Sequence, residues 1–143
     1  MDQVAGTRYS GMNRSIPSAA LAMLLALGGC VTASAKPEPM PLTSWTFVSI
    51  DGRAPVAKTT SLRIYEGRIA ANVGCNGMGA NAKLIGGRIV AGPVISTQMY
   101  CEGVMEQERA VGALLRAKPK MTVRGTTMTL TGGGHSAQLR RED

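Results

Sequence analysis

Residues 62–73, LRIYEGRIAANV, decide the fold class of this chain. On each side of Glu66-Gly67, apolar side chains alternate with others, which is the period-2 pattern of a strand with one buried face. A glycine-containing link between two such runs is typical of a β-hairpin. The stretch therefore predicts two antiparallel strands joined by a tight turn.

Similar runs lie on both sides of this hairpin. Residues 45–50 end at the turn signal Asp51-Gly52, and glycines at 86–87, 125 and 132–134 separate the later runs. We expect about eight strands, at residues 45–50, 62–65, 69–73, 80–85, 88–91, 121–124, 128–131 and 135–140.

One segment, Glu102 to Lys118, follows a helical period. Its acidic residues come early and its basic residues late, which complements the helix dipole, and Pro119 ends it. Short antiparallel strands with a single helix predict a mainly β fold: a small, closed or nearly closed antiparallel β-barrel with the helix packed over one end or face. An open sheet with a packed helix is the alternative.

The N-terminal segment predicts export. No charged residue occurs between Ser15 and Ala35. The apolar centre at residues 19–27 is too short for a membrane-spanning helix, which needs about 20 residues, but it suits a signal peptide. Arg14 supplies the positive charge that precedes such a centre. Met12 is therefore the expected start, and residues 1–11 are an upstream extension.

Leu27-Gly28-Gly29-Cys30 resembles the lipobox of bacterial lipoproteins, in which the cysteine thiol receives diacylglycerol. A plain secretory signal or an uncleaved anchor is the alternative. By resemblance to lipoproteins of Gram-negative bacteria, Val31 indicates sorting to the outer membrane, where each buried methylene of an acyl chain such as palmitate contributes about 0.8 kcal/mol. We expect a signal peptide in residues 1–29, a lipidated Cys30 with a Pro-rich tether in residues 30–42, and one domain in residues 43–143.

Three motifs occur in order along that domain: Trp45, Gly74-Cys75-Asn76, and Thr97-x-Met99-x-Cys101 just before the helix. In combination they resemble the META domain family, which includes heat-inducible HslJ-type lipoproteins. The resemblance extends from about Leu42 to Leu139, with Gln98 where a basic residue is common. It implies a barrel-like fold, these motif residues as a shared feature, and an association with heat or envelope stress.

Cys75 and Cys101 carry a prediction of their own. Export places both in an oxidising compartment, and with Cys30 committed to lipid two thiols remain, so one disulfide is the simple expectation. Two buried free thiols or a redox-active pair are the alternatives. Asn76 is expected to organise a turn. Gly77-x-Gly79-x-x-Ala82 fits a dinucleotide-binding pattern without the helix that it requires, and a tight turn or bulge is expected there.

Catalytic and nucleic-acid functions are disfavoured. The single histidine, His135, has no metal-ligand spacing, and its one internal acidic candidate, Asp51, lies at a turn. We expect His135 on a strand surface, and no catalytic, metal or cofactor site. Glu106 and Glu108 are expected to be solvated charges. The net charge is +7, but the basic residues are spread without an aromatic stripe, which disfavours nucleic acid as a partner.

We therefore expect a non-enzymatic outer-membrane lipoprotein, facing the periplasm, whose partners are the membrane and an acyl chain or an envelope protein segment. An apolar cavity between barrel and helix would hold that ligand, although a packed core explains the same residues. Its expected lining includes Val104, Val111, Leu115 and Met128. The alternative is a small periplasmic inhibitor, like those that block lysozyme, using the loop at residues 74–80 or 97–101; the positive charge counts against it.

Overall fold

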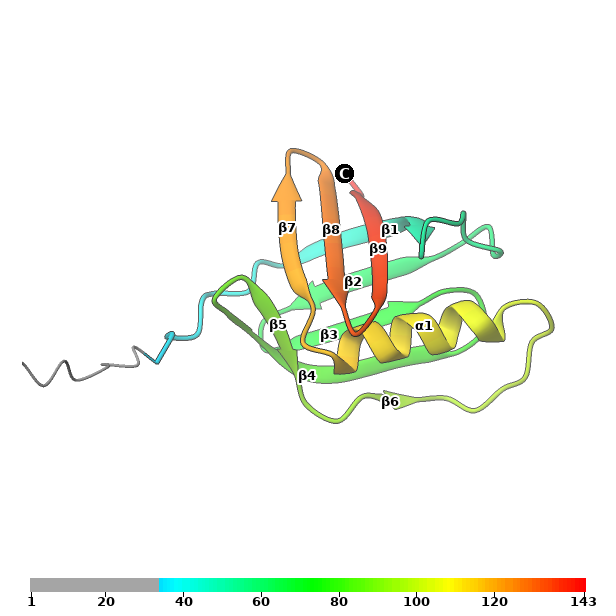
Figure 1. The fold of residues 1–143 in the computed structure, drawn as a ribbon, viewed down its shortest axis with the longest axis horizontal. Helices are drawn as coiled ribbons and strands as arrows, with labels where there is room; N and C mark the ends of the chain where they lie inside the picture. Colours follow the sequence, from blue (N-terminus) through cyan, green and yellow to red (C-terminus); the bar gives the residue numbers. More distant parts are fainter. Residues whose placement is uncertain (1–33) are drawn as a thin grey trace, which may run out of the picture. The chain divides into compact units, whose positions relative to one another are not determined.

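The computed structural model describes residues 34–143 (Figure 1). The predicted signal peptide and the lipidated Cys30 lie outside the described residues. Within residues 34–143 the chain forms nine strands and one helix: β1 (Thr43–Ile50), β2 (Ser61–Tyr65), β3 (Arg68–Asn72), β4 (Gly77–Ile85), β5 (Arg88–Ala91), β6 (Ile95–Ser96), α1 (Met105–Arg116), β7 (Lys120–Arg124), β8 (Thr127–Gly132) and β9 (His135–Arg141).

Eight of these strands form a closed antiparallel barrel. Neighbouring strands pair in the order β3-β2-β1-β9-β8-β7-β5-β4, and β4 pairs again with β3 to close the ring. Closure is possible because the first half of β4, Gly77 to Asn81, pairs with β3, while the second half, Ala82 to Ile85, pairs with β5. The predicted mainly β, barrel-like fold is confirmed, and closure gives each of the eight strands a partner on both sides.

The hairpin at residues 62–73 forms as its sequence predicts. Ile64 pairs with Ile69 next to the turn, and Leu62 pairs with Ala71. These four side chains are buried, while the residues between them are more exposed. The same alternation in the other strands fills the barrel with aliphatic side chains and with Trp45 and Phe47. Removing this apolar surface from water is the main stabilising term of the fold.

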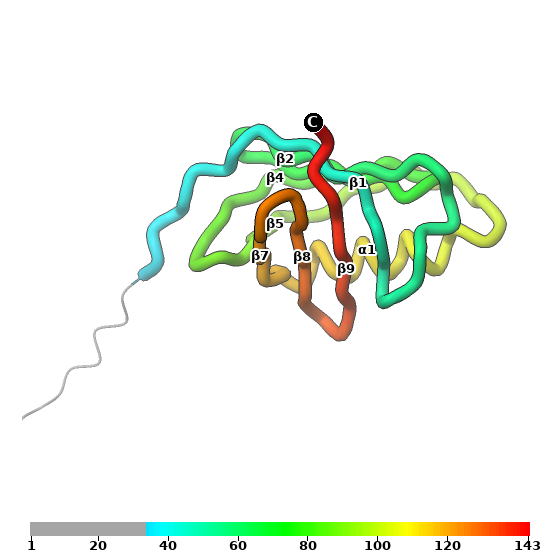
Figure 2. Tube along the Cα trace, turned by 90° about the horizontal axis from the view of Figure 1, so that it is seen from above, coloured from blue at the N-terminus to red at the C-terminus, as the bar shows by residue number. Residues whose placement is uncertain are grey.

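Helix α1 begins at Met105, three residues later than the expected Glu102. Gly103 has a φ of +77°, which an α-helix cannot include, so residues 102–104 form a turn before the helix. The helix contacts β1, β5, β8 and β9 (Figures 1 and 2). Its side chains that belong to the same core cluster as the strands are Ala110, Val111, Leu114 and Leu115.

Two other features differ from the sequence-based expectations. β4 begins at Gly77 rather than Ala80, so Gly77 and Gly79 are strand residues and form neither a tight turn nor a bulge. The two-residue strand β6 is too short to show any alternation, and it pairs with β4 in addition to the eight-stranded ring. No helix among residues 34–143 is both long enough and apolar enough to cross a membrane.

Candidate functional site

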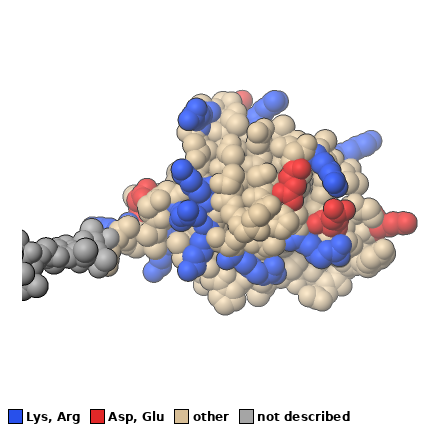
Figure 3. Space-filling view, viewed as in Figure 1, with Lys and Arg blue, Asp and Glu red and all other residues tan. Residues whose placement is uncertain are grey.

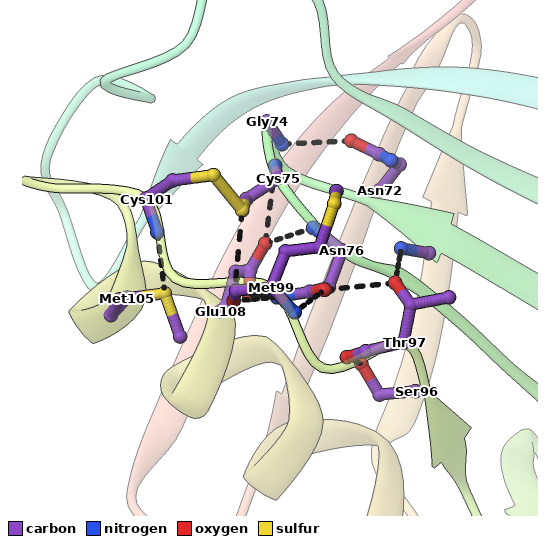
Figure 4. The surroundings of a disulfide bond; sticks show 11 residues. Asn72, Gly74, Cys75, Asn76, Ser96, Thr97, Met99, Cys101, Met105 and Glu108 are labelled. Carbon is purple, nitrogen blue, oxygen red and sulfur yellow. Dashed lines mark hydrogen bonds between the residues drawn. A yellow bond between two sulfur atoms is a disulfide. The ribbon is translucent and has the colours of Figure 1, made fainter.

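The motif residues of the sequence, apart from Trp45, meet where the end of β3, the segment after β6 and the first turn of α1 come together (Figure 4). Cys75 and Cys101 form a disulfide with their Cα atoms 6.0 Å apart, so the predicted bridge is confirmed. Beside the disulfide, the buried carboxylate of Glu108 and the buried side-chain amide of Asn76 form hydrogen bonds that connect α1, the segment after β3 and the segment after β6. We call this group the clasp; it comprises Gly74, Cys75, Asn76, Thr97, Met99, Cys101 and Glu108.

Gly74 directs the chain from β3 into the clasp. Its φ is +128°, which side chains rarely adopt, and a Cβ built there would lie 2.3 Å from the Cβ of Ala57. Its N–H donates to Oδ1 of Asn72 at 2.8 Å. Glycine is therefore required here both by the backbone conformation and by the close approach of the β1–β2 connection.

Glu108 lies at the centre of the clasp. Its Oε1 accepts from the backbone N–H groups of Cys75, at 3.1 Å, and of Asn76. Its Oε2 accepts from Nδ2 of Asn76 at 2.8 Å. The residue is only 6% exposed, so the expectation of a solvated charge is wrong for Glu108. The helical spacing could have indicated that Glu108 is buried. It is four residues after Val104 and three before Val111, and so lies on the buried face of α1.

Asn76 uses both the oxygen and the nitrogen of its side-chain amide. Besides Glu108, its Nδ2 donates to the carbonyl of Met99 at 2.8 Å. Its Oδ1 accepts from the Oγ1 of Thr97 and from the N–H of Met99, each at 2.8 Å. Oγ1 of Thr97 in turn accepts from the N–H of Gly77 at 3.2 Å. Asn76 thus organises a segment distant in the sequence rather than a turn of its own.

Two motif residues play different parts from the rest. Met99 takes part in the clasp through its backbone, whose N–H and carbonyl both form hydrogen bonds with Asn76. The residue itself is 57% exposed. Trp45 lies in the barrel core, where its Nε1 donates to Oγ1 of Thr43 at 2.9 Å. The guanidinium of Arg141 lies 5.6 Å from the centroid of the Trp45 ring, a cation–π contact. Trp45 therefore supports the barrel and not the clasp.

The clasp holds one exposed segment on the barrel. We call residues 95–100, which contain β6, the strap. Ile95 and Ser96 pair with Gly79 and Met78 of β4, and the clasp fixes the other end of the strap at Thr97 and Met99. Ile95, Met99 and Tyr100 are among the exposed large hydrophobic side chains of the domain, and Tyr100 is 81% exposed. A groove of about 410 Å³ lies between the strap and α1.

The bonds of the clasp hold its chain segments in one arrangement. Cys75 and Cys101 are joined, and the carboxylate of Glu108 accepts three hydrogen bonds. Throughout residues 34–143, each buried side-chain nitrogen or oxygen atom has a hydrogen-bond partner. Such a satisfied polar network fixes one arrangement of its segments.

A second polar cluster connects two strand ends on the other side of α1. Nδ1 of His135, the first residue of β9, lies 2.8 Å from Oδ2 of Asp51 in the turn after β1. Oδ1 of Asp51 accepts from the N–H of Ser136 at 2.8 Å. This backbone hydrogen bond first, and then the His135 side chain, hold the pKa of Asp51 below its ordinary value of 3.8. Asp51 is therefore the acidic partner of His135 despite its place in a turn.

The groove beside this cluster has a volume of about 520 Å³. Within residues 34–143 it is lined by Ile50, by residues of the β1–β2 connection, of the turn before α1 and of α1, and by His135, and none of these is Ser, Thr, Cys or Lys. Within the described part of the chain, no group of three or more His, Cys, Asp or Glu residues is placed to hold a metal ion.

The expected ligand cavity and one of the expected loops differ in the structure. Val104, Val111, Leu115 and Met128 are at most 8% exposed, and the two grooves beside α1 are lined by other residues. The segment 74–80 does not protrude, because Cys75 and Asn76 are buried and β4 begins at Gly77. Of the two segments considered for an inhibitor, the one at 97–101 is the more exposed, since residues 97–100 are all exposed and the other segment exposes only Gly74 and Gly77.

Comparisons with known proteins agree with this architecture. The family model described as META domain matches residues 38–143. A solved NMR structure has a TM-score of 0.61 at 16% identity, covering 68% of this chain and 87% of its own. An NMR structure of a protein from Burkholderia xenovorans has a TM-score of 0.56 at 18% identity, covering 92% of this chain and 99% of its own. At these identities the two structures support the fold alone. No curated protein matches the chain.

Proposed function

Because this chain belongs to the META domain family, we propose that it is an exported, non-enzymatic binding protein of the HslJ type. In this proposal a lipid on Cys30 anchors it to the periplasmic face of the outer membrane. Its strap binds an extended segment of an envelope protein, under the heat or envelope stress associated with such lipoproteins. The observation that carries the proposal is the clasp, which uses a disulfide and a buried carboxylate to hold an exposed strap in place.

The disulfide supports the exported location. Disulfides persist in oxidising compartments such as the periplasm and are rare in the cytosol, where thiols are kept reduced. Cys75 and Cys101 lie 26 residues apart in the sequence, and their bridge joins the β3–β4 connection to the segment before α1. A domain with such a bridge suits an oxidising compartment outside the cytosol, and the lipobox ending at Cys30 predicts the same location.

The second polar cluster supports a role without catalysis. A His–Asp pair takes part in acyl transfer when the histidine activates a nucleophile. Among the described residues, none that lines the groove beside His135 and Asp51 carries a hydroxyl, thiol or amine that could serve as one. The hydrogen bonds of Asp51 instead connect the turn after β1 to the start of β9.

The strap is the part of the described surface best suited to a protein segment. β6 pairs with β4 on one side, which leaves its other edge available for a further strand from a partner. The exposed Ile95, Met99 and Tyr100 would add apolar contacts to that pairing. The packed barrel interior favours such a surface over an internal site for an acyl chain.

The anchor is tested by expressing the full chain and its Cys30→Ala variant in a Gram-negative host. We expect the intact mass of the unaltered protein to show loss of residues 1–29 and gain of acyl chains, and we expect the protein to sediment with the outer membrane. The Cys30→Ala variant should retain its N-terminal segment and gain no lipid. An unacylated Cys30 in the unaltered protein would overturn the anchor.

The strap is tested with a photo-crosslinking phenylalanine analogue at position 100. Tyr65, a second exposed tyrosine on β2, offers a matched control position. In stressed cells, we expect position 100 to crosslink to a discrete envelope protein that mass spectrometry can identify, and position 65 to give no such product. Equal products at the two positions, or none at position 100, would contradict binding at the strap.

A further inference from the structure

Exposed basic side chains gather at one end of the domain. They lie where the β4–β5 hairpin meets β7 and the C-terminal end of α1, and Figure 3 shows this gathering on the side where the described chain begins. We call them the basic end; its members are Lys83, Arg88, Arg116, Lys118 and Lys120. The strand pairing joins Arg88 to Lys120, and Nη1 of Arg88 donates to the carbonyl of Lys118 at 3.1 Å.

One carboxylate, that of Glu38 on the tether, lies near the five positive charges of this end, and none of the five is in an ion pair within the described chain. The ion pairs within residues 34–143 are Arg53 with Glu106 and His135 with Asp51, and neither includes a residue of the basic end. Near α1, the acidic side chains in Figure 3 lie toward the other end of the helix. Five like charges with a single carboxylate nearby keep an excess of positive potential, which attracts an anionic partner.

The N-terminal tether identifies that partner. The N–H of Glu38 donates to the carbonyl of Leu84 at 2.7 Å, so the tether contacts the barrel beside Lys83. Cys30 precedes Glu38 by eight residues in the sequence. A fully extended chain of that length spans at most about 30 Å, which bounds the distance between Leu84 and a lipid on Cys30. The lipid anchor, on which this step of the argument rests, would therefore keep the basic end close to the bilayer.

We infer that the basic end docks on the phosphate groups of anionic phospholipids in the membrane that holds the chain. Lys and Arg side chains near an anionic leaflet are each attracted to it, and a basic patch next to an acyl anchor binds more firmly than either alone. The docking is electrostatic, so it weakens as salt is raised. It orients the domain with the β4–β5 hairpin toward the lipid.

The test measures the reactivity of lysine side chains in the full processed protein on vesicles. The vesicles contain phosphatidylcholine alone or with phosphatidylglycerol, and an amine-reactive label is read out by peptide mass spectrometry. We expect several-fold lower labelling of Lys83, Lys118 and Lys120 on the anionic vesicles, reversed by high salt. Lys58, an exposed lysine of the β1–β2 connection, is the internal control and should label equally on both.

Charge removal sharpens the test. Lys118→Gln with Lys120→Gln should lower the docking equilibrium about 30-fold, because each lost charge is worth about fivefold at an anionic surface, so the protection of Lys83 should be lost. Arg63→Gln with Arg140→Gln, on β2 and β9, removes the same charge away from the basic end and should leave Lys83 protected. A native disulfide and an unchanged circular dichroism spectrum show that each variant is folded.

The outcomes separate this inference from the proposed function. Equal labelling of Lys83 on both vesicle types, or protection of Lys58 to the same degree, would overturn the docking. Protection by a soluble acidic peptide but not by anionic vesicles would overturn it in favour of a protein partner. An unlipidated Cys30, read from the intact mass, would overturn the proposed anchor alone, because anionic vesicles added to the protein report the basic end whether or not the chain is acylated.

Discussion

Glu108 in the clasp and Asp51 beside β9 are two carboxylates with similar bonding patterns in different surroundings. Glu108 accepts from two backbone N–H groups of a distant part of the chain and Asp51 from one, and each bonds one side chain, Asn76 or His135. Glu108 is 6% exposed, whereas the side chain of Asp51 is 38% exposed. The clasp also contains a disulfide, and the Asp51 cluster has none.

The difference shows that burial, more than bonding pattern, sets the energetic weight of a contact. Water replaces a lost partner at the exposed Asp51, so the loss there is small. Glu108 is buried, so water replaces its carboxylate poorly, and removal of the carboxylate leaves three buried donors without their partner. We therefore expect the clasp to contribute much more than Asp51 to the free energy of unfolding.

The largest effect is expected for Glu108→Ala. Orphaning the N–H groups of Cys75 and Asn76 and the amide of Asn76 should lower the free energy of unfolding by about 4 kcal/mol. Glu106→Ala, two residues earlier on the exposed face, is the matched control and should cost about 0.5 kcal/mol or less, since its contact with Arg53 is exposed. Urea unfolding of both variants measures the contrast. Equal losses would show that burial does not distinguish the two glutamates.

The disulfide is expected to contribute somewhat less. Its 26-residue separation predicts that Cys75→Ser with Cys101→Ser lowers the free energy of unfolding by about 3.5 kcal/mol, because the unfolded chain regains loop entropy. Adding a reductant to the unaltered protein should produce the same shift in the urea midpoint, and should leave the double variant unchanged. A reductant effect on the double variant would assign the shift to something other than this bridge.

Gly74→Ala tests the steric fit at the entrance to the clasp. A Cβ there meets the Cβ of Ala57 at a positive φ, and we expect a loss of about 2 to 3 kcal/mol. Gly67→Ala is the control, since Gly67 also has a positive φ, of +74°, but open space around it. That substitution should cost about 1 kcal/mol from backbone strain alone. A smaller loss at Gly74 than at Gly67 in thermal unfolding would contradict the close approach.

The smallest effect, below about 1 kcal/mol after solvent screening, is expected at Asp51. The folded pKa of Asp51 is depressed, so its contribution to stability is present above 3.8, the unfolded value, and is lost as the pH falls through the lower folded value. Asp51→Asn should therefore flatten the dependence of unfolding free energy on pH below about 4 while changing it little at neutral pH. An unchanged slope in acid would show that Asp51 does not titrate differently on folding.

The strands were predictable because each one displays its buried face locally. The alternation at Leu62, Ile64, Ile69 and Ala71 is visible in twelve consecutive residues. In a strand with one buried face, every second side chain points to the core, so the pattern itself indicates the strand. β6 was not predictable, since two residues carry no period and its pairing is supplied by β4. The start of α1 was misplaced because a helical period cannot show that Gly103 adopts a positive φ.

The clasp was predictable only in part. Its cysteines followed from counting thiols in an exported chain, and the family resemblance pointed to Asn76, Thr97 and Met99. Glu108 was misread because an acidic residue in the first turns of a helix is normally solvated. The pairing of Asp51 with His135 was missed for a different reason: 84 residues separate them, and only the neighbouring positions of β1 and β9 bring them together.

The sequence by itself determined the strand pattern, the helix, the thiols that pair and the excess of positive charge, because periodicity, composition and counting are properties of the chain. The tertiary structure decided which carboxylate is buried, which lysines and arginines share one end, and that the tether contacts β4. Each of these depends on a distance between residues far apart in the sequence. Barrel closure sets those distances, and no local pattern encodes them.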